Sequence, residues 1–177
     1  TTYSHNYDKA GVYYIKPRGK ATEYNANPFV PAIKIGTPTA LATINGSLGS
    51  VFPTLSNGSQ PSFNTTFTGC SNLRGKIPEN LFEGIHGQTD KTYMFAQLFD
   101  GCTKLEGPIP EKLFATITGT PVQGMFESTF RNCSSLKGSI PEKLFQSVAG
   151  DMSNYMFNMT FQGCSGLTGS IPGDLFK

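Results

Sequence analysis

The sequence predicts an α+β repeat solenoid, a stack of short strands and helices with an N-terminal β-hairpin cap. Two observations predict this fold class. One motif recurs four times, reading GCSNLRGKIPENLF from Gly69 and NCSSLKGSIPEKLF from Asn132, and its cysteines lie 32, 31 and 31 residues apart: Cys70, Cys102, Cys133 and Cys164. A fixed period of this size indicates units that cannot bury their apolar face alone and therefore stack on their neighbours.

Composition excludes several classes of partner. Only 15% of the 177 residues are charged and the net charge is +2, so neither a nucleic-acid footprint nor an acidic tail is present. No apolar run approaches the ~20 residues that span a bilayer, and the residues from Thr1 onward lack the features of a signal peptide. We expect a mature or excised fragment of a longer protein, with no nucleic-acid partner and no membrane insertion.

The N-terminal third predicts a β-rich cap. Alternating residues 13–16 and 21–24 flank turn residues and predict an antiparallel hairpin. Short strands are expected at residues 32–35 and 41–44, and a short amphipathic helix at residues 46–55. These elements predict a degenerate first repeat that buries the open end of the stack, as terminal repeats must.

Each regular repeat predicts a longer helix, a short strand and a second, short helix. Two phenylalanines lie four residues apart and a cysteine follows three residues later, as in Phe126, Phe130 and Cys133, which places them on one helical face. The Leu-x-Gly-x-Ile sequence after each cysteine alternates as a strand does. Pro78, Pro110, Pro141 and Pro172 then suit the first position of a short helix.

The order Phe-x-x-Cys-Ser-x-Leu-x-x-x-Ile-Pro-x-x-Leu-Phe resembles the BspA-like leucine-rich-repeat surface proteins of bacteria, here with repeats of about 31 residues. The resemblance implies a leucine-rich-repeat-like stack, a location outside the cell or at its surface, and a role in adhesion. With it, the chain divides into a cap with the degenerate first repeat at residues 1–62 and a leucine-rich-repeat-like solenoid at residues 63–177.

Catalytic chemistry is scarce in this sequence. His5 and His86 lie in different segments, and no catalytic or phosphate-binding motif occurs. Glu79, Glu111 and Glu142 follow the prolines, where acids stabilise the first turn of a helix through its dipole. We therefore expect no enzyme, no cofactor and no catalytic residue.

The cysteines predict neither a metal site nor disulfides. No Cys-x-x-Cys or Cys/His grouping of the kind that binds zinc occurs. All four cysteines occupy one phase of the repeat, and equivalent positions of stacked units lie about 8–10 Å apart. This separation exceeds the ~7 Å limit for the Cα atoms of a disulfide. A ladder of small buried thiols is therefore expected.

Outward-facing positions of the short strands are the candidate binding face. The sequence predicts a non-catalytic module that binds a protein or glycan through the residues Arg74, Lys76, Glu106, Lys137, Ser139, Thr168 and Ser170. A merely solvated edge is the alternative for this face, because it carries no aromatic anchor. For the whole chain, the alternative is a structural stalk or a component that assembles end to end without a ligand.

The last repeat predicts an open end. It supplies Leu167, Ile171, Leu175 and Phe176 but no helix after them. Uncovered apolar patches and strand edges recruit other chains. A monomer is the favoured state, and end-to-end self-association is the second.

Overall fold

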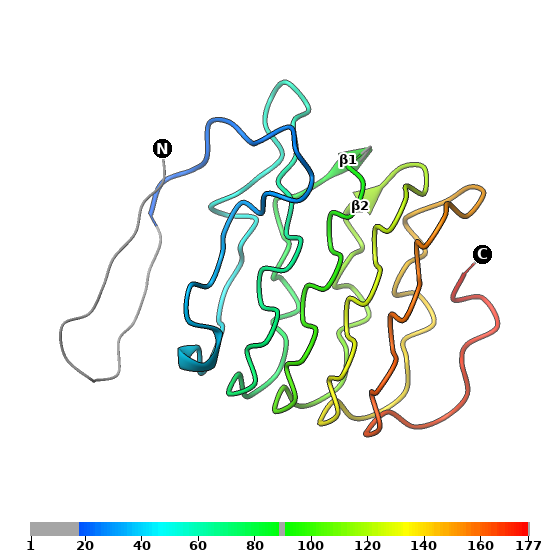
Figure 1. Ribbon diagram of the computed structural model, residues 1–177. Coiled ribbons are helices and arrows are strands. Elements are labelled where there is room, and N and C mark those ends of the chain that lie inside the picture. The colour runs from blue at the N-terminus through cyan, green and yellow to red at the C-terminus, as the bar shows by residue number, and fades with distance from the viewer. Residues whose placement is uncertain (1–17, 89–90, 177) are drawn as a thin grey trace.

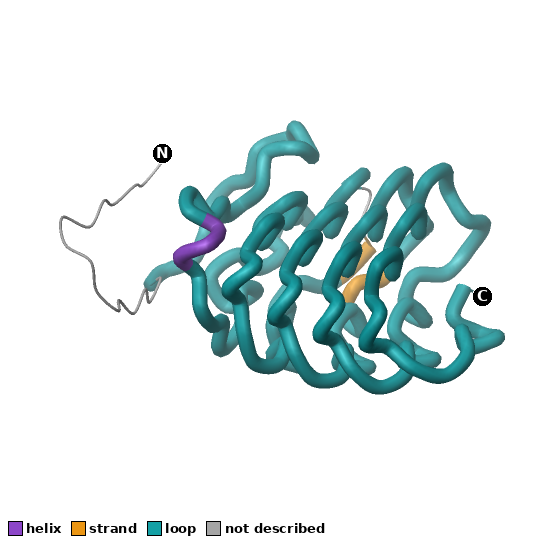
Figure 2. Tube along the Cα trace, turned by 60° about the horizontal axis from the view of Figure 1, so that its bottom comes forward, coloured by secondary structure: helices purple, strands orange, loops and turns teal. Residues whose placement is uncertain are grey.

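The computed structural model describes residues 18–88 and 91–176. Regular secondary structure within these residues is confined to a 3-10 helix and two short strands: η1 at Pro38–Ala40, β1 at Gly87–Gln88 and β2 at Ile117–Thr118 (Figure 2). β1 and β2 run parallel, with Gly87 opposite Ile117 and Gln88 opposite Thr118. The remainder of the described chain forms turns and irregular segments.

The predicted fold class, an α+β repeat solenoid of short strands and helices, is therefore wrong. Neither the longer nor the shorter helix of the expected unit forms, because η1 is the one helix that the described residues contain. The expected strands of the Leu-x-Gly sequences are reduced to single parallel bridges, such as Gly75 with Leu105 and Gly138 with Leu167. What the sequence period produces is a set of irregular segments that lie side by side (Figure 1).

Four of these segments carry the phenylalanine pairs, and we call them the Phe segments: residues 63–70, 93–102, 124–133 and 155–164. Every second residue donates its backbone N–H to a carbonyl of the next Phe segment, as Phe95 does to Met125 at 3.0 Å and Phe126 to Met156 at 2.9 Å. The residues between donate within the segment, three residues back, as Leu98 does to Phe95. The backbone N–H groups of a Phe segment thus bond alternately to the next segment and within their own segment, and they are satisfied without a helix.

Backbone conformation explains why the Phe segments are not helical. Every fourth residue adopts a positive φ, for example Ser128 at 54° and Asn132 at 61° in the third segment. A residue in the left-handed conformation interrupts an α-helix. Glycine adopts this conformation at the lowest energetic cost, and asparagine adopts it more readily than most other residues. The last such position of each segment carries those residues: Gly69, Gly101, Asn132 and Gly163.

The core consists of aromatic rings that face one another from segment to segment. Phe95 and Phe126 are stacked at 5.6 Å with 3° between their planes, and Phe99 and Phe130 at 5.8 Å with 13°. A third column, on the opposite side of the core, contains Phe114 and Phe145 at 5.9 Å. The inward placement of the phenylalanines and cysteines agrees with the sequence pattern even though the helices do not form.

The segments after each Ile-Pro are successive turns rather than the predicted short helix. Leu113 donates to Pro110, and Ile117 to Phe114, both across three residues. Consequently Glu79, Glu111 and Glu142 do not stabilise a helix dipole; all three are exposed.

The N-terminal part also departs from the prediction. The first strand of the expected hairpin, residues 13–16, lies outside the described residues, and residues 21–24 form no strand. Residues 32–35 and 41–44 are not strands, and residues 46–55 form turns in place of the amphipathic helix. Proline explains part of this difference, since Pro28, Pro31 and Pro38 cannot donate to a neighbouring segment.

Candidate binding surface

The candidate residues predicted from the sequence lie on one exposed row. We call the set Arg74, Lys76, Glu106, Lys137, Ser139, Thr168 and Ser170 the outward row; all seven residues are exposed. Backbone bonds hold their segments in register: Glu106 donates to Gly75 at 2.9 Å, Lys137 to Gly107 at 2.9 Å and Thr168 to Gly138 at 2.8 Å. The structure therefore brings these residues together along one side of the molecule.

A glycine in each of these segments sets the direction of the row. The backbone at Gly107 has a φ of +78°, and a Cβ there would lie 2.9 Å from Cγ of Lys76. The residue after each glycine thus lies over the glycine of the next segment: Lys76 over Gly107, Pro108 over Gly138 and Ser139 over Gly169. At Gly138 and Gly169 a Cβ would make only ordinary contacts, so the feature that favours glycine at all three positions is the positive φ.

Next to the row lies an open groove of about 760 Å³, which sequence reasoning missed. Its polar lining comes from Ser139 and Ser170 of the row and from Glu111 and Glu142. The Ile-Pro-Glu sequence was the available signal, because its recurrence predicts glutamates at one position of successive segments. The hydroxyls donate and accept hydrogen bonds, whereas ionised carboxylates accept only.

His86 is the one histidine in the described part of the chain, and it is exposed. Its backbone N–H donates to Oγ1 of Thr54 at 2.9 Å, and its carbonyl accepts from the same hydroxyl at 2.8 Å. These bonds tie residues 54 and 86 together through the backbone. Among residues 18–88 and 91–176, no three His, Cys, Asp or Glu side chains group as metal ligands do.

The four cysteines are free thiols, and three of them are fully buried. Cys102 donates to the carbonyl of Phe67 at 3.2 Å, Cys133 to Phe99 at 3.1 Å and Cys164 to Phe130 at 2.9 Å. Burial raises the pKa of Cys70 and of Cys164 to about 11 and raises that of Cys102 and Cys133 further. Raised pKa values suppress the thiolate and with it nucleophilic chemistry.

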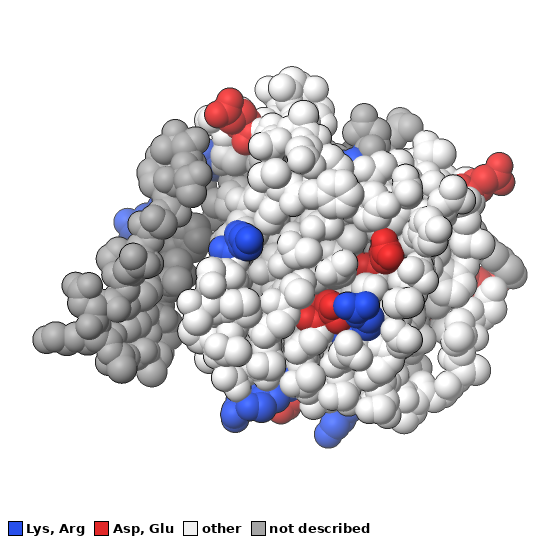
Figure 3. Space-filling view, in the orientation of Figure 1, with Lys and Arg blue, Asp and Glu red and all other residues white. Residues whose placement is uncertain are grey.

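A separate charged pair joins two adjacent Phe segments. The face of the molecule that Figure 3 shows carries charged side chains at scattered positions and is otherwise uncharged. The guanidinium of Arg131 donates to both carboxylate oxygens of Asp100, with Nε to Oδ1 at 3.0 Å. Hydrogen bonding to Asp100, together with its charge, raises the pKa of Arg131. Because the two residues occupy equivalent positions of adjacent segments, the pair reinforces their register.

Comparisons with protein-family models, with curated proteins and with solved structures found no match to this chain. In the part of the chain that the structure describes, no helix has the length and apolar character needed to cross a membrane.

Proposed function

We propose that this chain is a non-catalytic binding module of a bacterial surface protein and that it contacts a protein or glycan outside the cell. The observation that supports the proposal best is the exposure of all seven residues of the outward row on hydrogen-bonded segments. A fixed row of polar side chains is suited to an extended ligand. The resemblance of the repeat motif to BspA-like surface proteins supports the location.

Charge suggests which ligands the row prefers. Arg74, Lys76 and Lys137 are exposed, and Glu106 is the one acid of the row. An excess of cations favours ligands with carboxylate, sulfate or phosphate groups, chiefly by steering their approach. The serine hydroxyls at the groove can add directional hydrogen bonds. Acidic glycans and acidic protein surfaces are therefore the proposed ligand classes.

A binding experiment tests this face directly. Immobilised sulfated, sialylated and neutral glycans, together with acidic and neutral proteins, would be probed with the wild type and with the triple variant Arg74→Ala/Lys76→Ala/Lys137→Ala. We expect the variant to lose about tenfold or more in affinity for an acidic probe, since each charge contact contributes of the order of 0.5 kcal/mol.

The matched control is Arg18→Ala/Lys20→Ala/Lys34→Ala, which removes the same three charges from exposed positions outside the row. It should bind as the wild type does. Equal losses in both variants would indicate a nonspecific charge effect. Unchanged binding by the outward-row variant would exclude this face.

A structural spacer is the second candidate, and the regular hydrogen bonding between segments favours it. On this alternative the chain is a monomer that projects other parts of a surface protein. Deletion of residues 93–123 would then leave cooperative unfolding intact and no probe would bind. Any specific binding to the outward row would contradict this second candidate.

A further inference from the structure

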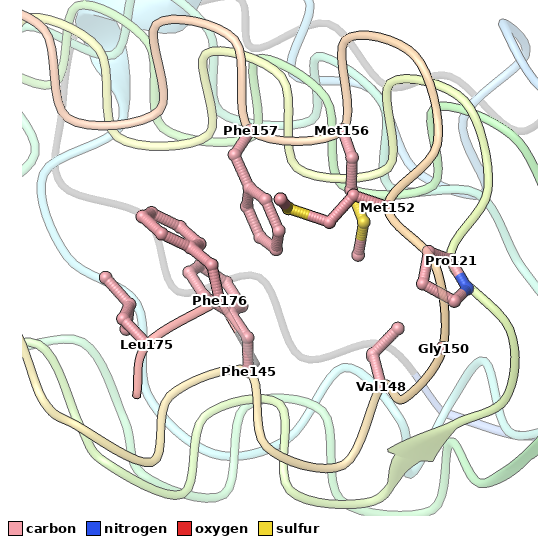
Figure 4. Close-up of a pocket in the computed structure, with 9 residues that line it drawn as sticks. All are labelled: Pro121, Phe145, Val148, Gly150, Met152, Met156, Phe157, Leu175 and Phe176. Atoms are coloured by element: carbon pink, nitrogen blue, oxygen red, sulfur yellow. The ribbon is translucent and has the colours of Figure 1, made fainter. Parts of the chain in front are cut away.

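The hollow drawn in Figure 4 is too small and too apolar to be a ligand site. Apolar side chains line it, and the rings of Phe157 and Phe176 face each other across it. Its volume of about 10 Å³ admits about one water molecule. Reactivity that needs no pocket is found instead on exposed segments of the N-terminal part.

Two identical Asn-Gly-Ser sequences lie in that part, at residues 45–47 and 57–59. Both asparagines are exposed, and both glycines have a positive φ, +82° at Gly46 and +81° at Gly58. Because glycine has no Cβ, its backbone nitrogen can approach the side-chain amide of the asparagine before it. Both sequences therefore contain the groups for an intramolecular reaction in which this nitrogen attacks Cγ of asparagine. What differs between the two copies is their hydrogen bonding.

Hydrogen bonds hold the second copy in place. The N–H of Gly58 donates to the carbonyl of Leu55 at 2.9 Å, and Oδ1 of Asn57 accepts from the backbone N–H of Ser59 at 2.9 Å. Attack by the Gly58 nitrogen requires the first of these bonds to open.

The first copy has no such bonds. The N–H of Gly46 and the side-chain amide of Asn45 bond to no residue that the structure describes. A Cβ placed on Gly46 would meet no atom within 4 Å, so the surrounding space is open. Of the two glycine nitrogens, that of Gly46 is therefore the one available for the reaction.

We propose that Asn45 is a site of spontaneous deamidation and that the reaction loosens the contact of residues 47–49 with residues 81–83. The Gly46 nitrogen forms a bond to Cγ of Asn45, and its proton passes through the solvent to the amide nitrogen, which leaves as ammonia. Water then opens the five-membered imide at either carbonyl and yields aspartate or isoaspartate. Solvent water is the one co-reactant. The proposal does not depend on the outward row.

The residues that follow this site are fixed to a neighbouring segment. Oγ of Ser47 donates to the carbonyl of Glu83 at 2.9 Å, and the N–H of Leu48 donates to the carbonyl of Leu81 at 2.7 Å. Gly49 lies so close to the carbonyl of Glu83 that a Cβ has no room. Deamidation adds a negative charge, and isoaspartate also adds a methylene to the main chain two residues before Ser47. The longer main chain therefore shifts residues that have no space to move.

Ageing of the whole protein in mildly alkaline buffer tests the proposal, because the attacking nitrogen must lose its proton. Peptide mapping by mass spectrometry would follow aspartate and isoaspartate at positions 45 and 57 over time. The products at position 45 should form about fivefold faster, the factor that one additional hydrogen bond to be opened at position 57 supplies. Asn45→Gln should remove the first products and leave the reaction at position 57 unchanged, because glutamine would have to close a larger ring.

The same measurement in urea is the matched control, since unfolding removes the hydrogen bonds and keeps the two identical sequences. The two rates should then become equal. Equal rates in the folded protein, or a faster reaction at Asn57, would overturn the proposal. A preference for position 45 that persists unchanged in urea would also overturn it, because the cause would then lie in the neighbouring residues and not in the fold.

Amide hydrogen exchange of the isolated isoaspartate form tests the structural consequence. Exchange at Leu48 should be about fivefold faster than in the unmodified protein, because its bond to Leu81 is weakened. Exchange at Phe126, in the third Phe segment, should not change. The variant Asn45→Asp carries the charge without the longer main chain and should exchange as the unmodified protein does. Unchanged exchange at Leu48 in the isoaspartate form would refute the loosening.

Discussion

The third and fourth Phe segments share a sequence pattern but not an environment. Residues 124–133 contain Met-Phe-x-x-Thr-Phe-x-x-Cys, and residues 155–164 repeat it. Phe126, Phe130 and Cys133 are fully buried, whereas Phe157, Phe161 and Cys164 are only partly buried. A segment on each side completes the burial of the former. Burial in this fold is therefore a property of neighbouring segments and not of the motif alone.

The largest expected effect is a loss of stability that differs between the third and the fourth Phe segments. Phe130→Ala should lower the free energy of unfolding by about 3–5 kcal/mol, because it leaves a cavity between two stacked rings. Phe161→Ala, with a ring on one side, should cost about half as much. Urea unfolding measures both, and Ser139→Ala on the outward row should change stability by no more than about 0.5 kcal/mol. Equal losses for the two phenylalanines would show that the comparison is mistaken.

Alkaline pH provides the next test. The folded state raises the pKa of Cys102 and Cys133, so between the ordinary thiol pKa of about 9 and the raised values the unfolded chain loses protons that the folded chain keeps. Stability is therefore full below pH 9 and falls above it, by about 1.4 kcal/mol per pH unit for each such thiol.

Urea unfolding at a series of pH values measures this slope. The double variant Cys102→Ala/Cys133→Ala separates the contribution of these two thiols from that of all other titratable groups. It should show a shallower decline than the wild type between pH 9 and 11. Identical slopes would mean that water reaches these thiols in the folded state.

A smaller effect of opposite sign is expected at the end segment. Met159 has a φ of +55°, a conformation that costs an ordinary residue about 1 kcal/mol. Met159→Gly relieves this cost and should raise stability by roughly 0.5 kcal/mol after the greater freedom of the unfolded chain is counted. Ser165→Gly, at an exposed position without a positive φ, should lower it. Thermal unfolding compares the two, and a loss in both would contradict the conformational explanation.

The sequence pattern predicted which side chains face the core more accurately than it predicted the conformation of the backbone. Spacing of four and three residues, as in Phe126, Phe130 and Cys133, marks one face of a helix, but it also marks one face of a run of four-residue turns. The distinguishing signal was glycine or asparagine at positions 69, 101, 132 and 163, because a helix disfavours these residues and a left-handed conformation favours them. Bonds between segments 30 residues apart then decide the outcome, and no local pattern reports those bonds.

For the candidate surface too, the sequence predicted which side chains face outward but not the shape of the surface that they form. The outward row could be predicted because residues on either side of each inward leucine alternate between inward and outward positions. The structure keeps this alternation although each of these segments forms only a single β-bridge. The groove could not be predicted, because it depends on how Glu111 and Glu142 of separate segments lie relative to Ser139 and Ser170. The recurrence of the Ile-Pro-Glu sequence indicated that the glutamates share a position in successive segments, but it did not indicate a groove there.

Each Phe segment donates backbone hydrogen bonds to the segment that follows it, and this arrangement has a mechanical consequence. The first and last described residues lie at opposite ends of the row of segments (Figure 1), and the bonds between segments run along the line that joins those ends. Tension applied there loads each bond along its own axis, so the segments should detach one after another and not all at once. Each detached unit of about 31 residues would lengthen the chain by roughly 100 Å. A saw-tooth of such steps in single-molecule stretching is expected, and one abrupt rupture would contradict it. The molecule would then lengthen gradually under load while its remaining segments stay folded.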